Sequence, residues 1–233
     1  MQIGLLRCDE VGGDRLDRYG GYQQLFTELL NHTVDETVVV IDYDVVDGCL
    51  PGAPDEQDGW LVSGARSAAF DDDPWIADLL DVIRDLDAAR APLVGVCFGH
   101  QAIALALGGE VRYTGAWGVG VRHAELVAPS SATAPLDGGF RIAYSHRDQV
   151  VDLPATARLT SSTTHCPVAS FAVGNHILGI QGHPEFGTDF ARDLYTSRLV
   201  NIGDAAAAEA LSTLDSGTDR IAVAEWMLRV LAG

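Results

Sequence analysis

The sequence predicts an α/β protein with a doubly wound, mainly parallel sheet and antiparallel strands at its flank. Two observations predict this fold. As far as Gly109, short apolar runs alternate with segments of helical spacing, as in parallel strands joined by crossover helices. After Gly109 the pattern changes to a series of short β-type runs. The chain shows neither an internal repeat nor a second domain, so we expect one domain over residues 1–233.

The first half supplies the parallel strands and the helices that cover them. Its strands are short and strongly apolar, as is typical of strands buried on both faces. Asp73, directly before Pro74, is a good N-cap for one of the helices. In order, we predict a strand at 2–6, a helix over 22–30, strands at 37–41 and 59–63, a helix over 75–90, a strand at 92–96, and a helix that starts after Cys97 and stops at Gly108 and Gly109.

The second half supplies the antiparallel strands. The predicted runs are 110–113, 119–127, 140–144, 157–161, 168–173 and 176–180, followed by a helix over 188–200. Residues 203–217 are rich in alanine and small polar residues, which indicates a surface helix or linker before a last helix. We therefore treat 203–233 as a C-terminal linker and helix.

Residues 95–101, with the sequence GVCFGHQ, place Cys97 between an apolar strand and a helix. Gly95 and Gly99 flank the cysteine, and their missing side chains would let strand and helix approach while the thiol projects from a tight turn. The N-terminal end of the following helix would favour a thiolate and could hold an oxyanion through the amide of Phe98. Taken alone, the motif would more often be a buried, small apolar cysteine, and only its combination with other motifs favours a nucleophile.

His183 is the histidine whose surroundings suit a catalytic base. It follows an apolar strand and precedes Pro184, which favours extended backbone, so Glu185 should project to the same side as His183. A carboxylate there could orient the imidazole. An isolated His-x-Glu would more often be a surface pair, and only its combination with the cysteine motif favours catalysis.

These two motifs, GVCFGHQ and the HPE that follows 86 residues after the cysteine, resemble the class I (triad-type) glutamine amidotransferase family. The segments 58–67 (DGWLVSGARS) and 144–150 (YSHRDQV) resemble the family's oxyanion loop and substrate segment. The combination is most similar to the small stand-alone members, a group that includes γ-glutamyl peptidases. The resemblance implies the flavodoxin-like fold of that family.

The resemblance also implies a role for each matching residue. Cys97 would attack a γ-glutamyl carbonyl and form a thioester, His183 would transfer the proton, and Glu185 would orient His183. The oxyanion would lie between the amide of Phe98 and an amide of the loop formed by Gly64 and Ala65.

Three further residues match the family's substrate-binding positions, namely Gln101, Ser145 and His146. One segment departs from the family. Where Ser-Gly-Gly-Pro is usual, this chain has Ser63, Gly64, Ala65 and Arg66 in that order, so we expect the loop to resist the backbone flip that a second glycine would allow. Arg66 suits either a substrate carboxylate or a solvated loop.

Composition excludes several classes of function. The net charge of −18, from 15 basic and 33 acidic residues, argues against binding to nucleic acids and anionic membranes. The chain has neither a P-loop nor a dinucleotide-binding motif, so we expect no cofactor. The run Asp71 to Asp73 suits helix capping better than a metal site, because contiguous side chains diverge and no second group of ligands is evident.

The four cysteines, Cys8, Cys49, Cys97 and Cys166, form no C-x-x-C pair, and no secretory signal is evident before them. We therefore expect a cytoplasmic protein. The content of hydrophobic residues, 47%, predicts a soluble, globular fold. Cys166 lacks a glycine turn and is expected to be structural. His100, one turn from Cys97, is expected to support an anion.

Three functions remain open. The first is a glutaminase-type subunit that releases ammonia from glutamine for a separate synthetase. The second is a stand-alone γ-glutamyl peptidase that acts on glutathione-like or γ-glutamylated metabolites. The third is a catalytically idle binding module, which the complete set of Cys97, His183 and Glu185 disfavours. In the first two, the substrate is a small molecule.

Overall fold

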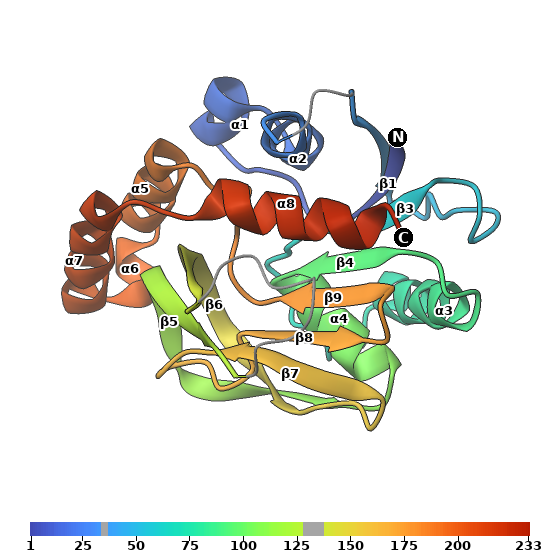
Figure 1. Cartoon of the computed structure of the whole chain (residues 1–233). Helices are drawn as coiled ribbons and strands as arrows, with labels where there is room; N and C mark the ends of the chain where they lie inside the picture. Colours follow the sequence, from blue (N-terminus) through green and yellow to red (C-terminus); the bar gives the residue numbers. More distant parts are fainter. Residues whose placement is uncertain (34–36, 128–137) are drawn as a thin grey trace.

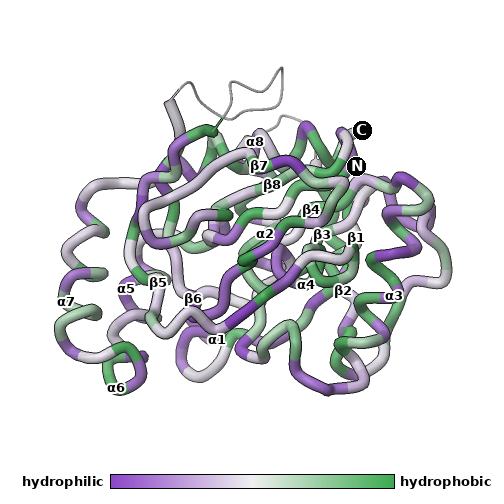
Figure 2. Tube along the Cα trace, turned by 90° about the horizontal axis from the view of Figure 1, so that it is seen from below, coloured by the Kyte–Doolittle hydropathy of each residue, from purple (hydrophilic) through white to green (hydrophobic). Residues whose placement is uncertain are grey.

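The computed structural model describes residues 1–33, 37–127 and 138–233. Five of its strands form a parallel sheet, in the order β2-β1-β3-β4-β9. Figure 1 labels the last four of them, and Figure 2 also labels β2. The five strands are β1 (Gln2–Arg7), β2 (Val39–Asp44), β3 (Gly59–Val62), β4 (Leu93–Val96) and β9 (Ile177–Ile180). The carboxyl ends of these strands meet at one edge of the sheet, which is where ligands bind in open α/β folds.

The sheet continues beyond β9 through antiparallel strands, in the order β8-β7-β5-β6. These are β5 (Glu110–Leu126), β6 (Phe140–Asp152), β7 (Ala157–Ser162) and β8 (Ser170–Val173). The predicted α/β fold, with a parallel core and an antiparallel flank, is confirmed. The grouping of one strand is wrong: β9, predicted among the antiparallel strands, pairs parallel with β4 on one side and antiparallel with β8 on the other.

Helices cover both faces of the parallel strands. On one face, α2 (Tyr22–Asn31) and α8 (Arg220–Leu231) pack on a cluster that includes Leu5 and Val94. On the other, α3 (Pro74–Ala88) and α4 (Phe98–Ala106) pack on Leu6 and Leu93. Neighbouring residues of one strand thus enter opposite cores, as the alternation of side chains in a strand requires. Figure 1 shows α8 lying across the strands on the face opposite α3 and α4.

Several boundaries differ from prediction. Two predicted runs are one strand, β5, which continues through register shifts such as that between Tyr113 and Gly118, and β6 extends well past its predicted end. Helix α1 (Asp14–Tyr19) is not predicted, because it is short and buries no residue, and its trace is mainly hydrophilic in Figure 2. Asp73 occupies the predicted N-cap of α3, but its side chain makes no capping hydrogen bond.

The C-terminal segment is helical. It comprises α5 (Thr188–Ser197), the short α6 (Leu199–Ile202), α7 (Asp204–Thr213), a 3-10 turn at Leu214–Ser216, and α8. Helix α7 lies against β5, where the small Ala210 meets Gly120 closely. The segment 203–217 is thus a packed surface helix. Within the described ranges, no helix has both the length and the apolar character needed to cross a membrane.

Candidate active site

Cys97 lies at the junction of β4 and α4 in a strained backbone conformation. Its φ of 53° and ψ of −99° place it in a region that residues other than glycine rarely adopt. Such strain persists only where the surroundings hold the backbone, and it is concentrated at functional sites. The Cys97 N–H donates to the carbonyl of Ile180 in β9, so the neighbouring parallel strand holds the turn in place. The tight turn expected at Cys97, between strand and helix, is therefore present.

The two flanking glycines allow this turn. A Cβ atom at Gly95 would lie 2.5 Å from the carbonyl carbon of Gly99, and one at Gly99 would lie 2.4 Å from the carbonyl oxygen of Val62. Real Cβ contacts do not become that short, so a larger residue at either position would push α4 away from β3 and β4. Because Gly95 and Gly99 have no side chains, the start of α4 can pack closely against the sheet.

His183 and Glu185 form a buried pair after β9. The imidazole Nδ1 lies 2.8 Å from Oε1 of Glu185, and both side chains are almost fully buried. The His183 N–H donates to the carbonyl of Ala143 in β6, a single antiparallel bridge that fixes the backbone of this segment. The same-side projection predicted from the His-Pro-Glu sequence is therefore present in the structure.

The third member of the cluster, Cys97, reaches the imidazole from the start of α4. Burial by itself lowers the pKa of His183, but the charge of Glu185, the charge of the Cys97 sulfur and hydrogen bonds to both residues outweigh it and raise that pKa to about 10. Gly64 packs against the cluster: a Cβ built there would lie 3.0 Å from Cε1 of His183 and 3.8 Å from Cβ of Cys97. The arrangement favours a protonated imidazole next to the sulfur.

Two groups of backbone amides lie near the sulfur. Phe98 is the first residue of α4, a position whose N–H has no acceptor within the helix, and its ring packs against Trp75. Gly64 and Ala65 follow β3 in the loop beside Cys97 and His183. The predicted oxyanion donors thus come from two neighbouring strand ends.

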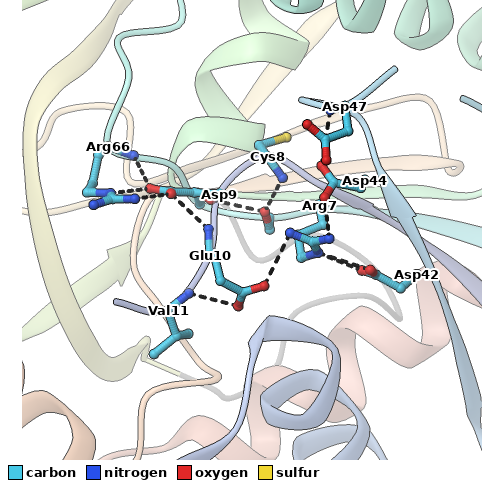
Figure 3. Close-up of polar contacts among 11 residues, drawn as sticks. Arg7, Cys8, Asp9, Glu10, Val11, Asp42, Asp44, Asp47 and Arg66 are labelled. Atoms are coloured by element: carbon cyan, nitrogen blue, oxygen red, sulfur yellow. Dashed lines mark hydrogen bonds and ion pairs between the residues drawn. The ribbon is translucent and has the colours of Figure 1, made fainter. Parts of the chain in front are cut away.

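Arg66, for which the sequence allows two interpretations, is paired within the protein. Its Nε and Nη2 donate to the carboxylate of Asp9 at 2.7 and 2.6 Å, and its backbone N–H donates to the same carboxylate at 2.9 Å (Figure 3). Its side chain is nevertheless 70% exposed and lines the cavity described next. Arg66 is therefore neither free for a substrate carboxylate nor merely solvated.

A cavity of about 280 Å³ opens above Cys97. Most of the predicted site residues line it together, namely Ala65, Cys97, Phe98, Gln101, Ser145, His146 and His183. Glu185 and Gly64 do not line it: Glu185 is almost fully buried beside His183, and Gly64 lies against His183 and Cys97. No residue of 203–217 lines this cavity, so that stretch does not form part of its wall.

Each predicted substrate-binding side chain also makes hydrogen bonds within the protein. The Gln101 amide donates to the Asp148 carbonyl and to the Gln181 side chain, which leaves its oxygen as the free group. Nδ1 of His146 lies 3.1 Å from the Asp148 carbonyl, while its Nε2 is buried without a partner in the described residues. Burial lowers the pKa of His146 to about 3, so this imidazole is neutral.

Sequence reasoning misses Arg198 and Tyr22, which also line the cavity. Nη1 of Arg198 donates to the Ser145 hydroxyl at 2.7 Å, and its guanidinium lies over the ring of Trp117. Burial lowers the pKa of Arg198, and in the part of the chain that the structure describes Arg198 forms no ion pair with a carboxylate. Burial and the charges of Glu185, Asp9 and Cys97 raise the pKa of Tyr22. Both residues come from helices or helix ends whose sequence carries no recognisable motif.

Two other predicted residues lie away from the cavity. Cys166 is buried, its thiol donates to the Val168 carbonyl, and burial raises its pKa to about 12, in keeping with a structural role. His100 does not support an anion as expected: it is fully buried against Phe171, and burial lowers its pKa to about 3, which keeps it neutral. Among the described residues, no cluster of three His, Cys, Asp or Glu side chains could hold a metal ion, and Asp71 instead accepts from the N–H of Ala68.

Known proteins share both the sequence pattern and the fold of this chain. The family model described as glutamine amidotransferase class-I matches residues 16–198. The chain is 34% identical to γ-glutamyl peptidase 4 of Arabidopsis thaliana over 185 residues, which cover 76% of this chain and 72% of the relative. It is 31% identical to one of the subunits of the glutamine-hydrolysing GMP synthase of Halobacterium salinarum over 176 residues, 73% of this chain and 86% of that one.

Among solved structures, a glutamine amido transferase from Methylobacillus flagellatus superposes with a TM-score of 0.75. The match covers 100% of this chain and 92% of the other at 23% sequence identity, which demonstrates a shared fold. Given the family match over residues 16–198 and these relatives, the chain belongs to the class-I glutamine amidotransferase family.

Proposed function

We propose that this protein is a cysteine-nucleophile hydrolase that cleaves the γ-glutamyl amide of glutamine or a related γ-glutamyl compound. The observation that carries the proposal is the buried cluster of Cys97, His183 and Glu185 beneath one cavity, on an elbow with φ of 53°. Such an arrangement of nucleophile, base and orienting carboxylate is what acyl transfer requires.

In the proposed reaction, the Cys97 sulfur attacks the γ-carbonyl and a γ-glutamyl thioester forms. His183 gives its proton to the departing ammonia or amine and then takes a proton from the water that hydrolyses the thioester, which releases glutamate. Glu185 holds the imidazole through Nδ1, so that Nε2 faces the reaction. The amides of Phe98 and Ala65 stabilise the oxyanion, and each such donor is worth about 3 kcal/mol.

The free end of the γ-glutamyl group needs partners for an ammonium and a carboxylate. The Gln101 oxygen can accept from the ammonium, because both hydrogens of its amide are engaged elsewhere. Arg198, held by Ser145, is a half-buried cation at the cavity wall and suits the carboxylate. His146 is neutral and can contribute only hydrogen bonds.

A second candidate is a stand-alone γ-glutamyl peptidase. It is favoured by Arg15, which lines the cavity and adds positive charge beyond Arg198. The two other arginines that line the cavity are paired, Arg66 with Asp9 and Arg147 with Asp148. A glutathione-like substrate carries a second carboxylate on its leaving group, whereas glutamine does not. The relatives named γ-glutamyl peptidases also favour it, while the relative named as part of a GMP synthase favours a separate ammonia-accepting synthetase.

We further propose a cytoplasmic protein, because all four cysteines are free and a catalytic thiol requires a reducing compartment. The experiment that tests the function is glutamate release by the purified protein from glutamine and, separately, from a panel of γ-glutamyl peptides. Preferential cleavage of peptides would favour the peptidase. Slow hydrolysis of glutamine with no cleavage of peptides would favour a synthetase-linked subunit, and release from neither would contradict the proposal.

A further inference from the structure

The loop after β3 is attached to the segment after β1 by an ion pair that the usual Ser-Gly-Gly-Pro pattern could not make. Asp9 accepts three hydrogen bonds from Arg66, one from the backbone N–H and two from the guanidinium (Figure 3). A proline at this position would have neither a backbone donor nor a charged side chain. Arg66 therefore gives the loop three hydrogen-bond donors, and Asp9 lies where its carboxylate accepts from all of them.

A second attachment holds the other end of the same loop. The Ser63 N–H donates to the carbonyl of Leu6, and the Cys8 N–H donates to the Ser63 hydroxyl at 2.9 Å. That hydroxyl in turn donates to the carbonyl of Gly64 at 3.0 Å. The loop is thus fixed at Ser63 and Gly64 on one side and at Arg66 on the other.

These contacts set the direction of two peptide groups. In a trans peptide the C=O and the following N–H point in opposite directions, and the described chain has no cis peptide. Because the Gly64 carbonyl points to the Ser63 hydroxyl, the Ala65 N–H points the other way. Because the Arg66 N–H points to Asp9, the Ala65 carbonyl points away from Asp9. A flip of either peptide would break the hydrogen bonds that hold it.

We propose that Asp9 is a positioning residue that, through Arg66, locks the loop with the amide of Ala65 available to the oxyanion. The inference rests on the proposed function, and it assigns to Asp9 a role that none of the sequence motifs indicates. Asp9 lines the cavity, but among the described residues it makes no hydrogen bond to Cys97 or His183. Its carboxylate is engaged by Arg66 and the Glu10 N–H, so its effect on the reaction passes through the loop.

The surroundings of Asp9 make this lock rigid. Its side chain is only 13% exposed, and its Oδ1 also accepts from the N–H of Glu10 at 2.8 Å. Burial favours the neutral acid, but the hydrogen bonds from Arg66 and Glu10 outweigh it and lower the pKa of Asp9. The carboxylate is therefore ionised, and a charged acceptor makes the stronger hydrogen bonds.

A second set of ion pairs, centred on Arg7, lies beside this contact and does not include the oxyanion loop. Arg7, at the end of β1, donates to Asp42 and Asp44 of β2 and approaches Glu10 (Figure 3). The strand end that carries Asp9 is thereby tied to its neighbour on the side away from the oxyanion loop. Among the described residues, Asp42 makes no hydrogen bond or ion pair with the loop. Arg7 keeps Asp44 and Glu10 as partners when Asp42 is replaced, so Asp42 offers a matched control.

The test compares Asp9→Ala and Asp9→Asn with Asp42→Ala, using steady-state kinetics on the best substrate. Removing an oxyanion donor costs about 10²–10³ in kcat, so misplacing one should lower kcat by about 10- to 100-fold for Asp9→Ala. We expect KM within about threefold of the starting protein, because a transition-state contact is lost. Asp9→Asn, which keeps one acceptor for the Arg66 N–H, should lose less, and Asp42→Ala should leave kcat unchanged.

Arg66→Ala provides a second, independent test should Asp9→Ala fail to fold. It removes the guanidinium but keeps the backbone hydrogen bond to Asp9, so kcat should fall by less than in Asp9→Ala, about 3- to 10-fold. In the double variant, Arg66→Ala should lower kcat little beyond the effect of Asp9→Ala, because both substitutions remove the same contact. An unchanged kcat in the folded Asp9 and Arg66 variants would overturn the proposal, as would a raised KM at constant kcat.

The failure of this inference and that of the proposed function give different results. If Cys97→Ala retains activity, the nucleophile is wrong and the proposed function fails, whatever Asp9 does. If Cys97→Ala is inactive and the Asp9 variants are fully active, the function stands and the lock is refuted. Melting temperatures measured for every variant separate a loss of kcat from a loss of folded protein.

Discussion

The imidazole of His183 lies flat on the ring of Phe186, with the ring centroids 4.1 Å apart and the planes within 6° of parallel. Phe186 packs in turn on Phe190, at a centroid distance of 4.4 Å. The hydrogen bond to Glu185 fixes the rotation of the imidazole within its plane, and the stack on Phe186 fixes the plane itself. One short segment after β9 therefore supplies the base, the carboxylate that orients it and the surface on which it rests.

Replacement of Phe186 by leucine should lower kcat by about tenfold, because a small error in the placement of a catalytic group costs about that much or more. The free energy of unfolding should fall by about 1–2 kcal/mol through lost packing. Kinetics and chemical denaturation check both numbers. Phe70→Leu is the control, since Phe70 is 46% exposed and lies outside the cavity. Equal kcat values in the two variants would refute the positioning role of Phe186.

Replacement of Glu185 by glutamine should lower the pKa of His183 from its value of about 10, because the charge of Glu185 is a main cause of the raised value. If the reaction begins with a protonated imidazole, the alkaline limb of kcat/KM should move to lower pH in the variant. A pH profile from about 5 to about 11 measures this shift. An alkaline limb at the same pH in both proteins would show that the charge of Glu185 does not raise the pKa of His183.

The same raised pKa links stability to pH. The folded state holds the His183 proton more tightly than the unfolded chain, whose histidine titrates near 6.5. Its contribution to stability is therefore complete below about pH 6.5 and is lost as pH rises through about 10. The difference in unfolding free energy between the protein and its Glu185→Gln variant should shrink over that window, which denaturation at several pH values can follow.

Replacement of Arg198 by alanine should weaken substrate binding. A hydrogen bond to a charged group contributes about 1.5–3 kcal/mol, so kcat/KM should fall by about 10- to 150-fold, mainly through KM. Arg198→Lys should recover only part of this loss, since lysine cannot form the paired contacts of a guanidinium. Arg229→Ala is the control, because Arg229 lies on α8 away from the cavity. An unchanged KM in Arg198→Ala would exclude it from substrate binding.

Replacement of Gly99 by alanine should destabilise the protein. The new Cβ would lie 2.4 Å from the Val62 carbonyl oxygen, and overpacking of this kind costs about 1–3 kcal/mol. Gly52→Ala is the matched control, because its nearest atom would be the flexible Glu56 carboxylate at 3.5 Å. Thermal unfolding compares the two. A Gly99→Ala variant as stable as Gly52→Ala would show that α4 can move away from the sheet at little cost.

Local chemistry explains what can be predicted from the sequence. The elbow at Cys97 and the His183 pair are short segments whose geometry depends on glycine, proline and the alternation of extended chain, so their local shape follows from a few residues. The parallel strands carry continuous apolar runs and are predictable for the same reason. The grouping of β9 is wrong because pairing direction is decided by which strand lies beside it in space, which a single run does not encode.

The remainder of the site depends on contacts distant in sequence. Arg198 meets Ser145 across 53 residues, and Arg66 meets Asp9 across 57. Arg198 stands in no motif, and Arg66, although it belongs to the segment 58–67, has a partner that this segment does not identify. From composition alone, each arginine would be expected on the surface. The expectation for His100 is wrong because its position near Cys97 in sequence says nothing of the face of α4 on which it lies. Such relationships become visible only when the sheet has brought its strand ends together.

Formation of a γ-glutamyl thioester on Cys97 is the step on which the proposed function depends. It is tested most directly by rapid acid quenching of the protein during turnover, proteolysis, and mass spectrometry of the peptides. We expect a γ-glutamyl adduct on the peptide that contains Cys97, absent from Cys97→Ala. An adduct on another nucleophile such as Cys166, or glutamate release by Cys97→Ala at the rate of the unsubstituted protein, would contradict it.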